Sequence, residues 1–292
     1  MKEKYYCSIG SAIMAITPKI VKEKTFRCVS VNEKCDNLSE KIQQVLKKQT
    51  KQKAVLEMLL NGNVVPVSHI KNLLGVTDSP IDSLVKKGIL VIENVQTYRG
   101  NCNFEYKSKT VAPILNEEQL NAVNVLNDSI ENQYTRPILI KGVTGSGKTE
   151  VYMAAIEKAL QKGKQCIVLV PEISLTPQTV DRFVSRFGDK VAVTHSRLSD
   201  GERYDQWNRA RKNEISVMIG PRSAIFTPFE NLGLVVIDEE HETTYKSDQQ
   251  NPKFDAREVA EKLGELYNSV TVLGSATPSI TSFYKAKNNI YK

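Results

Sequence analysis

The chain has 292 residues, of which 40% are hydrophobic and 25% are charged, a composition typical of about two globular domains. No stretch approaches the roughly 20 apolar residues of a membrane-spanning helix, and the first residues lack the apolar core of a secretory signal, so a cytoplasmic protein is expected. The net charge of +7 favours a polyanionic partner such as nucleic acid, while the five scattered cysteines, without a CxxC pair, predict neither disulfides nor a zinc site.

Residues 1–49 are interpreted as an N-terminal connecting segment. Two short runs, 4–9 and 27–31, have β-type composition, and apolar residues recur at helical spacing over 38–46. The segment is too small to own a hydrophobic core.

Residues 50–110 are predicted to form a small winged-helix domain. The pattern indicates helices around 54–59, 67–74 and 77–87, a break at 61–63, and a β pair at 89–94 and 96–99, followed by a linker at 101–113. In this fold the third helix ordinarily enters a DNA groove, where Lys86 and Lys87 could contact phosphate. Winged helices also bind proteins or act as spacers, and lysines at a helix end stabilise the helix dipole. Both interpretations stay open.

Residues 111–292 are predicted to form a doubly wound parallel α/β sheet, because helix and strand patterns alternate along them. Helices are expected at 117–131 and 149–160, and strands at 138–141, 166–170, 191–194, 216–219, 234–237 and 270–273. Nucleotide sites in such sheets lie at the carboxyl ends of the strands. The sequence motifs of this region all fall at those ends.

A P-loop, Gly-Val-Thr-Gly-Ser-Gly-Lys-Thr, follows the first of these strands. Its glycines let the backbone curl so that N–H groups point at phosphate oxygens, and the next helix presents its positive N-terminus to the same anion. Lys148 is expected to reach the β- and γ-phosphates, and the Thr149 hydroxyl is expected to hold Mg²⁺. The predicted nucleotide-binding residues are Gly142, Val143, Thr144, Gly145, Ser146, Gly147, Lys148 and Thr149. A P-loop by itself indicates that a protein binds a nucleotide, but it does not identify the function of that protein.

An acidic segment, Asp-Glu-Glu-His, follows the apolar strand pattern at 234–237. A strand-terminal aspartate beside a P-loop can complete the Mg²⁺ shell, and the next carboxylate can orient and deprotonate the attacking water. Asp238 is therefore the predicted metal residue and Glu239 the predicted base. With Lys148 they make up the predicted catalytic set. In isolation, an acidic stretch of this kind would be interpreted as a solvated turn.

Five segments, in order along the chain, resemble the motif set of the superfamily 2 helicases, and most closely that of the replication-restart DNA helicases. These segments are 142–149, 170–178, 220–224, 238–241 and 274–278. The resemblance covers roughly residues 50–292. It implies a RecA-like helicase lobe that uses ATP and Mg²⁺ to unwind DNA at stalled forks. The implied partners are forked or single-stranded DNA and the primosome and single-strand-binding proteins, with no membrane and a monomeric chain.

The resemblance also implies roles around the nucleotide. Gln119 matches a glutamine ahead of the P-loop that can read adenine, although capping the helical turn begun at Asn116 is an equal alternative. The resemblance implies that Ser275 and Thr277, through His241, couple the state of the bound nucleotide to the strength of DNA binding. His195 matches a family position after a strand but receives no chemical role.

Three segments hold the DNA-binding residues that the resemblance implies. They are Pro171, Glu172, Thr176 and Gln178 in the first, Arg222 and Ser223 in the second, and Tyr245 and Phe254 in the third. Arg222 is expected to make a charge-assisted bond to phosphate, with a structural ion pair as the alternative. The third segment, 242–258, matches an aromatic-rich loop that senses DNA, by base stacking on its rings. Packing stays open for Phe254, and Asp255 stands where many relatives carry histidine.

Full-length relatives continue into a second helicase lobe with an arginine finger, and they carry cysteine-rich zinc clusters. An arginine finger is worth roughly three to five orders of magnitude in rate in comparable NTPases. These 292 residues contain neither feature. The chain is therefore expected to be a fragment or truncated product that binds Mg-nucleotide, hydrolyses it slowly and does not unwind DNA alone. The alternative is an ATP-gated module that binds branched DNA without motor action.

Overall fold

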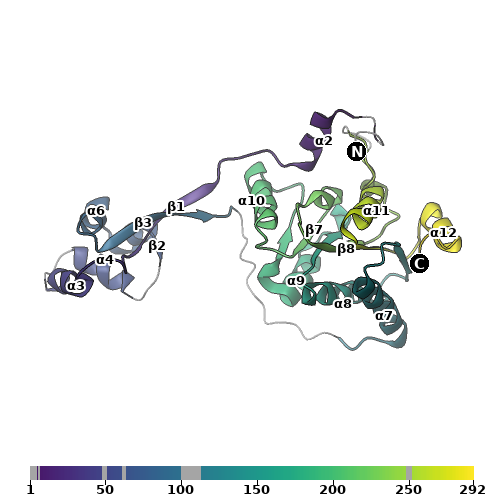
Figure 1. The fold of residues 1–292 in the computed structure, drawn as a ribbon, viewed down its shortest axis with the longest axis horizontal. Helices are drawn as coiled ribbons and strands as arrows, with labels where there is room; N and C mark the ends of the chain where they lie inside the picture. Colours follow the sequence, from purple (N-terminus) through teal and green to yellow (C-terminus); the bar gives the residue numbers. More distant parts are fainter. Residues whose placement is uncertain (1–4, 6, 48–50, 61–63, 100–112, 248–251) are drawn as a thin grey trace. The chain divides into compact units, whose positions relative to one another are not determined.

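The computed structural model describes residues 5, 7–47, 51–60, 64–99, 113–247 and 252–292. The chain divides into two compact units (Figure 1). The smaller unit comprises Lys22–Arg99, and the larger one comprises Met1–Val21 together with Gly100–Lys292. The smaller unit is therefore inserted into the sequence of the larger one.

The smaller unit is built on strand β1 (Lys24–Val31), which pairs antiparallel with β2 (Val65–Pro66) on one side and β3 (Leu90–Thr97) on the other. The β pair predicted within 89–99 is wrong, because those residues form the single strand β3. Its partner is β1, in the segment interpreted as a connection. The unit accordingly runs from Lys22 to Arg99 and not from 50 to 110.

Four helices complete the smaller unit: α3 (Leu38–Leu46), α4 (Lys51–Leu59), α5 (Val67–Leu74) and α6 (Asp78–Lys86). They enclose a separate hydrophobic core that includes Val29, Leu56, Ile70 and Leu84, each fully buried. The helix patterns predicted from 38 to 87 are confirmed. The predicted break at 61–63 and most of the linker at 101–113 lie outside the described residues.

A short helix, α2 (Ile9–Ile16), precedes the smaller unit and belongs to the larger one. Ser8 caps it, because its hydroxyl accepts a hydrogen bond from the backbone N–H of Ser11 at 3.0 Å. A strand was predicted over 4–9. Of this range, residues 4 and 6 lie outside the described part of the chain. The prediction is wrong at Ile9, which is the first residue of α2.

The larger unit contains a six-stranded sheet in the order β4-β9-β8-β5-β7-β6, and all neighbouring strands in it are parallel. The strands are β4 (Ile138–Lys141), β5 (Gln165–Leu169), β6 (Val191–Val193), β7 (Val217–Gly220), β8 (Leu232–Ile237) and β9 (Val270–Ser275). This confirms the predicted doubly wound α/β fold. Strands β5, β7, β8 and β9 are buried along their whole length, because both faces of the sheet are covered.

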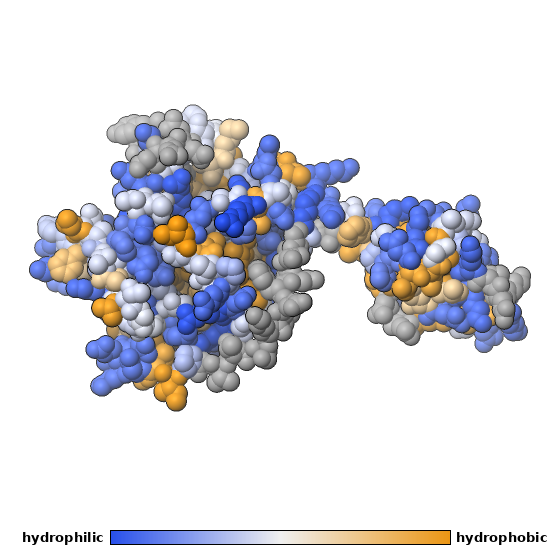
Figure 2. Space-filling view, turned by 180° about the vertical axis from the view of Figure 1, so that it is seen from behind, coloured by the Kyte–Doolittle hydropathy of each residue, from blue (hydrophilic) through white to orange (hydrophobic). Residues whose placement is uncertain are grey.

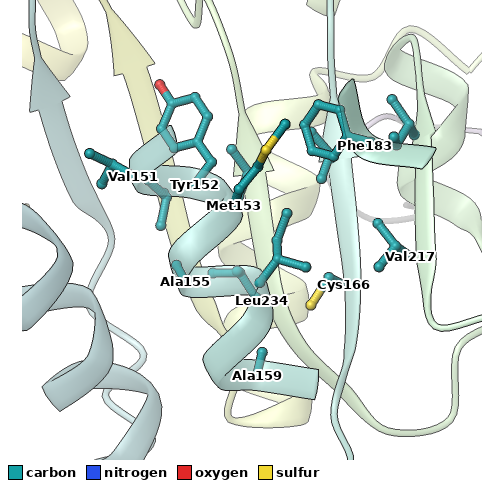
Figure 3. Close-up of a cluster of buried hydrophobic side chains, with 14 of the residues drawn as sticks. Val151, Tyr152, Met153, Ala155, Ala159, Cys166, Phe183, Val217 and Leu234 are labelled. Atoms are coloured by element: carbon teal, nitrogen blue, oxygen red, sulfur yellow. The ribbon is translucent and has the colours of Figure 1, made fainter. Parts of the chain in front are cut away.

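Alternate residues of the central strands pack on opposite faces of this sheet. On one face Cys166 and Val168 of β5 belong to a buried cluster with residues of α7 (Glu117–Asn132), α8 (Lys148–Gln161) and α9 (Pro177–Phe187). On the other face Ile167 and Leu169 pack with α10 (Asp200–Arg211) and α11 (Ala256–Tyr267). Figure 3 shows side chains of α8 beside the strands that carry Cys166, Val217 and Leu234. The two cores fix the strand ends from which the candidate site is built.

Hydrophilic residues predominate on the face drawn in Figure 2, and apolar residues form small separate areas among them. None of the described helices is both long enough and apolar enough to cross a membrane.

Candidate functional site

The P-loop joins β4 to α8, as predicted, and its glycines are sterically required. Gly147 has a left-handed backbone with φ of +83°, and a Cβ there would lie 2.3 Å from Nε2 of Gln119. A Cβ on Gly142 would lie 2.7 Å from Oγ of Ser146. The loop therefore folds back over the amino end of α8, whose first N–H groups have no partners within the helix.

Lys148, the first residue of α8, lies over this loop. Its side chain is 9% exposed, and Nζ donates to the carbonyl oxygen of Gly142 at 2.7 Å. Nζ also lies 3.9 Å from Oε1 of Glu239. A cation, a curled glycine backbone and a helix N-terminus thus converge on one cradle, which fits the phosphates of a nucleotide.

Asp238 follows the last residue of β8, and two tyrosines hold it. The hydroxyl of Tyr152 donates to its Oδ1 at 3.2 Å, and that of Tyr245 donates to its carbonyl oxygen at 2.5 Å. Tyr152 reaches Asp238 from α8 by passing over Gly274. Burial, together with the neighbouring charge of Glu239, raises the pKa of Asp238. The carboxylate is thus fixed in position and partly desolvated.

Glu239 has a left-handed backbone with φ of +47°, which is unusual for a residue with a side chain. Its two carboxylate oxygens lie 3.9 Å from Nζ of Lys148 and 3.6 Å from Nδ1 of His241. The predicted catalytic residues Lys148, Asp238 and Glu239 are therefore neighbours in the structure. Sharp turning of the chain after β8 places the second carboxylate beside the P-loop lysine.

The oxygens of Thr149 and Asp238 suit Mg²⁺, which is commonly bound through one or two carboxylates together with substrate phosphates. Among the described residues, no group of three or more His, Cys, Asp or Glu side chains is placed to hold a metal ion. The two oxygen donors, a hydroxyl and a carboxylate, fit a metal that shares its ligands with a nucleotide.

Replacing Asp238 with asparagine is expected to stabilise the fold near neutral pH. Folding raises the pKa of the Asp238 carboxyl group. The free energy of unfolding therefore falls as the pH rises from the ordinary aspartate pKa to above the raised pKa of the folded state. Above that window the desolvated charge is a cost that the amide avoids. Thermal unfolding of the unaltered chain and of Asp238→Asn, at about pH 7 and about pH 4, should show a higher midpoint for Asp238→Asn only at about pH 7. An equal gain at both would contradict the assignment.

The residues predicted to couple the motifs are also brought together. Nδ1 of His241 lies 2.7 Å from Oγ of Ser275, and the backbone N–H of Thr277 donates to that same Oγ at 3.0 Å. The carbonyl oxygen of Ser275 accepts from the N–H of Gly142 at 3.1 Å. Ser275 therefore contacts both the acidic segment and the start of the P-loop. Its role in coupling stays a prediction.

Gln119 makes the cap that was the alternative to adenine reading. It forms a reciprocal capping box with Asn116 at the start of α7, with both hydrogen bonds at 2.9 Å. Its Nε2 donates to the carbonyl oxygen of Ser146 at 2.8 Å. The side chain thus buttresses the P-loop, and adenine reading stays a prediction.

Six of the eight predicted DNA-binding residues line one groove of about 910 Å³ in the larger unit: Pro171, Glu172, Arg222, Ser223, Tyr245 and Phe254. The N-terminal segment, including Met14 and Lys19, forms another part of its wall. Thr176 and Gln178 are not in that lining. Thr176 caps α9 through a 3.2 Å bond from the N–H of Thr179, and Gln178 is exposed on the first turn.

Tyr245 and Phe254 line this groove but are buried, so they leave little ring surface for the predicted stacking on bases, which stays a prediction. Tyr245 is 1% exposed, and its hydroxyl bonds to backbone carbonyls at the ends of β5 and β8. Phe254 is 7% exposed and packs edge-on against Phe226, with ring centroids 4.9 Å apart. The packing alternative for Phe254 is thus what the structure shows.

Arg222 makes structural hydrogen bonds, in place of the ion pair considered as its alternative. Its Nη1 donates to the carbonyl oxygens of Thr244 and Lys246, at 3.1 and 3.0 Å. Contact with a phosphate stays a prediction. His195 also lines the groove, and its Nδ1 is buried without a hydrogen-bond partner among the described residues.

Sequence reasoning missed three residues that organise the acidic segment: Tyr152, Glu240 and Arg257. Arg257 donates from Nη1 to the carbonyl oxygen of Glu240 at 2.8 Å and pairs with Asp255, which caps α11. The sequence signal for Tyr152 is weak, since one tyrosine in an apolar helix face looks like ordinary core. For Glu240 the signal was its place inside the acidic motif.

Comparison with known proteins places these features in a family. A model of the DEAD/DEAH box helicases matches residues 116–285. The chain is 40% identical to the replication restart protein PriA of Bacillus subtilis (strain 168), over 92% of this chain and 34% of that protein. It is 38% identical to PriA of Chlamydia trachomatis, over the whole chain and 39% of that protein. The chain thus spans between a third and two fifths of the length of these relatives.

Among solved structures, a RecG protein bound to a three-way DNA junction is similar, with a TM-score of 0.42 and 28% identity. The match covers 61% of this chain and 23% of that one.

Proposed function

This chain belongs to the DEAD/DEAH box helicase family, and from that premise we propose that it is the ATP-binding lobe of a DNA helicase that acts in replication restart. The observation that carries the proposal is the convergence of Lys148, Asp238 and Glu239 on the P-loop. In this proposal ATP is the nucleotide, and its phosphates lie in the cradle at the start of α8.

The catalytic roles follow from the chemistry of the three groups. Lys148 balances phosphate charge, Thr149 and Asp238 hold Mg²⁺, and Glu239 orients and deprotonates the attacking water. Bound Mg²⁺ would supply charge neutralisation on the phosphate oxygens. Support for Glu239 as base is its turned backbone, which brings its carboxylate beside Lys148.

Single-stranded or forked DNA is the proposed substrate, bound along the groove at the carboxyl edge of the sheet. Its proposed contacts are Pro171, Glu172, Arg222 and Ser223 in the groove, and Thr176 and Gln178 at the start of α9, outside the groove lining. His241, Ser275 and Thr277 are proposed to relay the nucleotide state to this groove, supported by their mutual hydrogen bonds. Partner primosome and single-strand-binding proteins, a monomeric state and a cytoplasmic location are proposed from similarity to the PriA relatives alone.

A steady-state ATPase assay of the 292-residue chain, with and without forked DNA, tests the proposal. Slow turnover is expected, together with saturable Mg-ATP binding. DNA affinity should fall steeply as salt rises, because a phosphate-tracking surface releases counterions. Affinity that responds to DNA structure while turnover does not would favour the alternative, an ATP-gated branched-DNA-binding module. Absence of Mg-ATP binding would refute the proposal.

A further inference from the structure

The groove that holds the proposed DNA contacts is not built by the sheet and its loops alone. Ser11 and residues 14–19 form part of its wall, together with Pro171, Arg222 and Ser223. These N-terminal residues belong to α2 and to the stretch that directly follows it. A segment from the other end of the sequence therefore lies where a bound strand would pass.

Two side chains attach this segment to the rest of the larger unit. The hydroxyl of Tyr5 donates to Oε2 of Glu258 at 2.7 Å, in a partly buried position. Nζ of Lys19 donates to Oδ2 of Asp200 at 3.3 Å, and these two side chains are 78% and 53% exposed. An exposed ion pair contributes little to stability, because water screens both charges. Lys19 can therefore exchange Asp200 for another anion at small cost.

Lys19 also decides the charge of the groove. In the described part of the chain, the charged residues that line it are Lys19, Glu172, Asp200, Arg203 and Arg222, with histidine counted as neutral. Three cations stand against two carboxylates, so the formal charge is +1 with Lys19 and zero without it. A surface that follows a polyanion needs an excess of positive charge. The N-terminal segment supplies that excess.

The two arginines of the groove already hold loops in place. Nη2 of Arg203 donates to the carbonyl oxygens of Ser196 and Leu198, both at 3.1 Å. Arg222 likewise donates to two backbone carbonyl oxygens. By contrast, the contact of Nζ of Lys19 within the described residues is the exposed Asp200 carboxylate. Lys19 is thus the cation of this groove that can turn to a phosphate without releasing a loop.

We propose that Lys19 binds a phosphate of the DNA strand in this groove by exchanging the Asp200 carboxylate for it, so that residues 11–19 form a further DNA-binding wall. The inference rests on the proposed binding of DNA in the groove and extends that contact surface to the N-terminal segment. A contact of this kind is with the DNA backbone, so it is independent of base sequence. Asp200 opposes it, since its carboxylate competes for Lys19 and repels the phosphate.

The chain carries its own probe for the test. Trp207 is its single tryptophan, and it lines the groove. A strand that enters the groove changes the surroundings of this ring and hence its fluorescence. Titration with oligothymidine at a series of salt concentrations, followed by the emission of Trp207, gives the affinity and its salt dependence together.

Lys19→Gln keeps most of the apolar stem and removes the charge. It should weaken the binding of oligothymidine about three- to tenfold at low salt. The slope of log affinity against log salt should become shallower by about 0.7, the value for one phosphate contact on a single strand. A strand of mixed sequence should show the same loss, because the contact is with phosphate.

Asp200→Asn should act in the opposite direction and tighten the binding of oligothymidine. Such a gain cannot come from partial unfolding. In the double variant with Lys19→Gln, the gain from Asp200→Asn should be smaller, because the two residues then no longer compete with the phosphate as a pair. Equal gains in the two backgrounds would show that Lys19 and Asp200 act independently, against the proposed exchange.

Lys262 and Glu265 provide the matched control. They form an exposed ion pair at 2.6 Å on α11, with side chains 66% and 61% exposed, and neither lines the groove. Lys262→Gln and Glu265→Gln change the same charges elsewhere on the surface. Both should leave the salt slope unchanged and the affinity within about twofold. The inference is overturned if Lys19→Gln behaves like Lys262→Gln.

The emission of Trp207 separates this inference from the proposed function. If oligothymidine changes the emission and Lys19→Gln has no effect, only the inference fails. If the chain binds no oligothymidine, or binds it without a change in emission, the groove is not the DNA site and both fail.

Discussion

Replacing Lys148 with alanine is expected to weaken the binding of Mg-ATP by about 100-fold, on the order of 3 kcal/mol. The ammonium group is nearly buried over the P-loop, where its charge is poorly screened by water. Removing it leaves the phosphates with backbone donors alone. Titration with a fluorescent ATP analogue measures the loss directly.

Lys158→Ala is the matched control for this experiment. It removes the same charge from the same helix, where Nζ forms a surface ion pair with Glu131 at 2.9 Å. Surface pairs contribute little, so nucleotide affinity should change by less than about twofold. Unaltered affinity in a folded Lys148→Ala chain would show that this cradle does not hold the phosphates.

Replacing Gly274 with alanine is expected to lower the free energy of unfolding by about 3 kcal/mol, at the upper end of overpacking effects. A Cβ at this position would lie 1.6 Å from the hydroxyl oxygen of Tyr152 and 2.7 Å from its Cζ. Tyr152 is 1% exposed and cannot move aside without disturbing the core around α8. Urea unfolding measures the change. Nucleotide binding should weaken too, because Tyr152 holds Asp238.

A double substitution tests the cause. Tyr152→Leu removes the ring, so in that background Gly274→Ala should cost about 1 to 3 kcal/mol less than it does alone. Gly10→Ala serves as the control substitution, since the nearest atom to its Cβ is Oγ of Ser8 at 3.9 Å. It should not destabilise the chain. If the losses in the free energy of unfolding caused by Gly274→Ala and Tyr152→Leu simply add in the double variant, the Tyr152 ring and the added methyl group do not collide.

Much of the larger unit could be predicted because its signals are local. Each central strand is a short apolar run, and parallel strands place their carboxyl ends at one edge of the sheet. The P-loop and the acidic segment therefore had to meet, although 90 positions separate Lys148 from Asp238. The observed contact between Lys148 and Glu239 follows from that topology.

What could not be predicted depends on partners distant in sequence. Nothing in the β3 pattern indicates that its neighbour is β1, since strand pairing is set by the shared core and not by either strand alone. Tyr245 looked like an exposed ring in a polar loop. Its burial depends on two backbone carbonyls, at Leu169 and Asp238, that only the folded sheet brings within reach of the hydroxyl.

The insertion of the smaller unit into the larger one has a consequence for synthesis on the ribosome. Residues Lys22–Arg99 are made early and contain every partner of their own sheet. Tyr5 is made earlier still, yet its hydroxyl bonds to Glu258, 253 positions later. Strand β4 likewise lies beside Lys292, whose N–H donates to Pro137. Non-local contacts of this kind form slowly. The smaller unit can thus finish folding before strand β9, the last strand of the larger unit, has been synthesised.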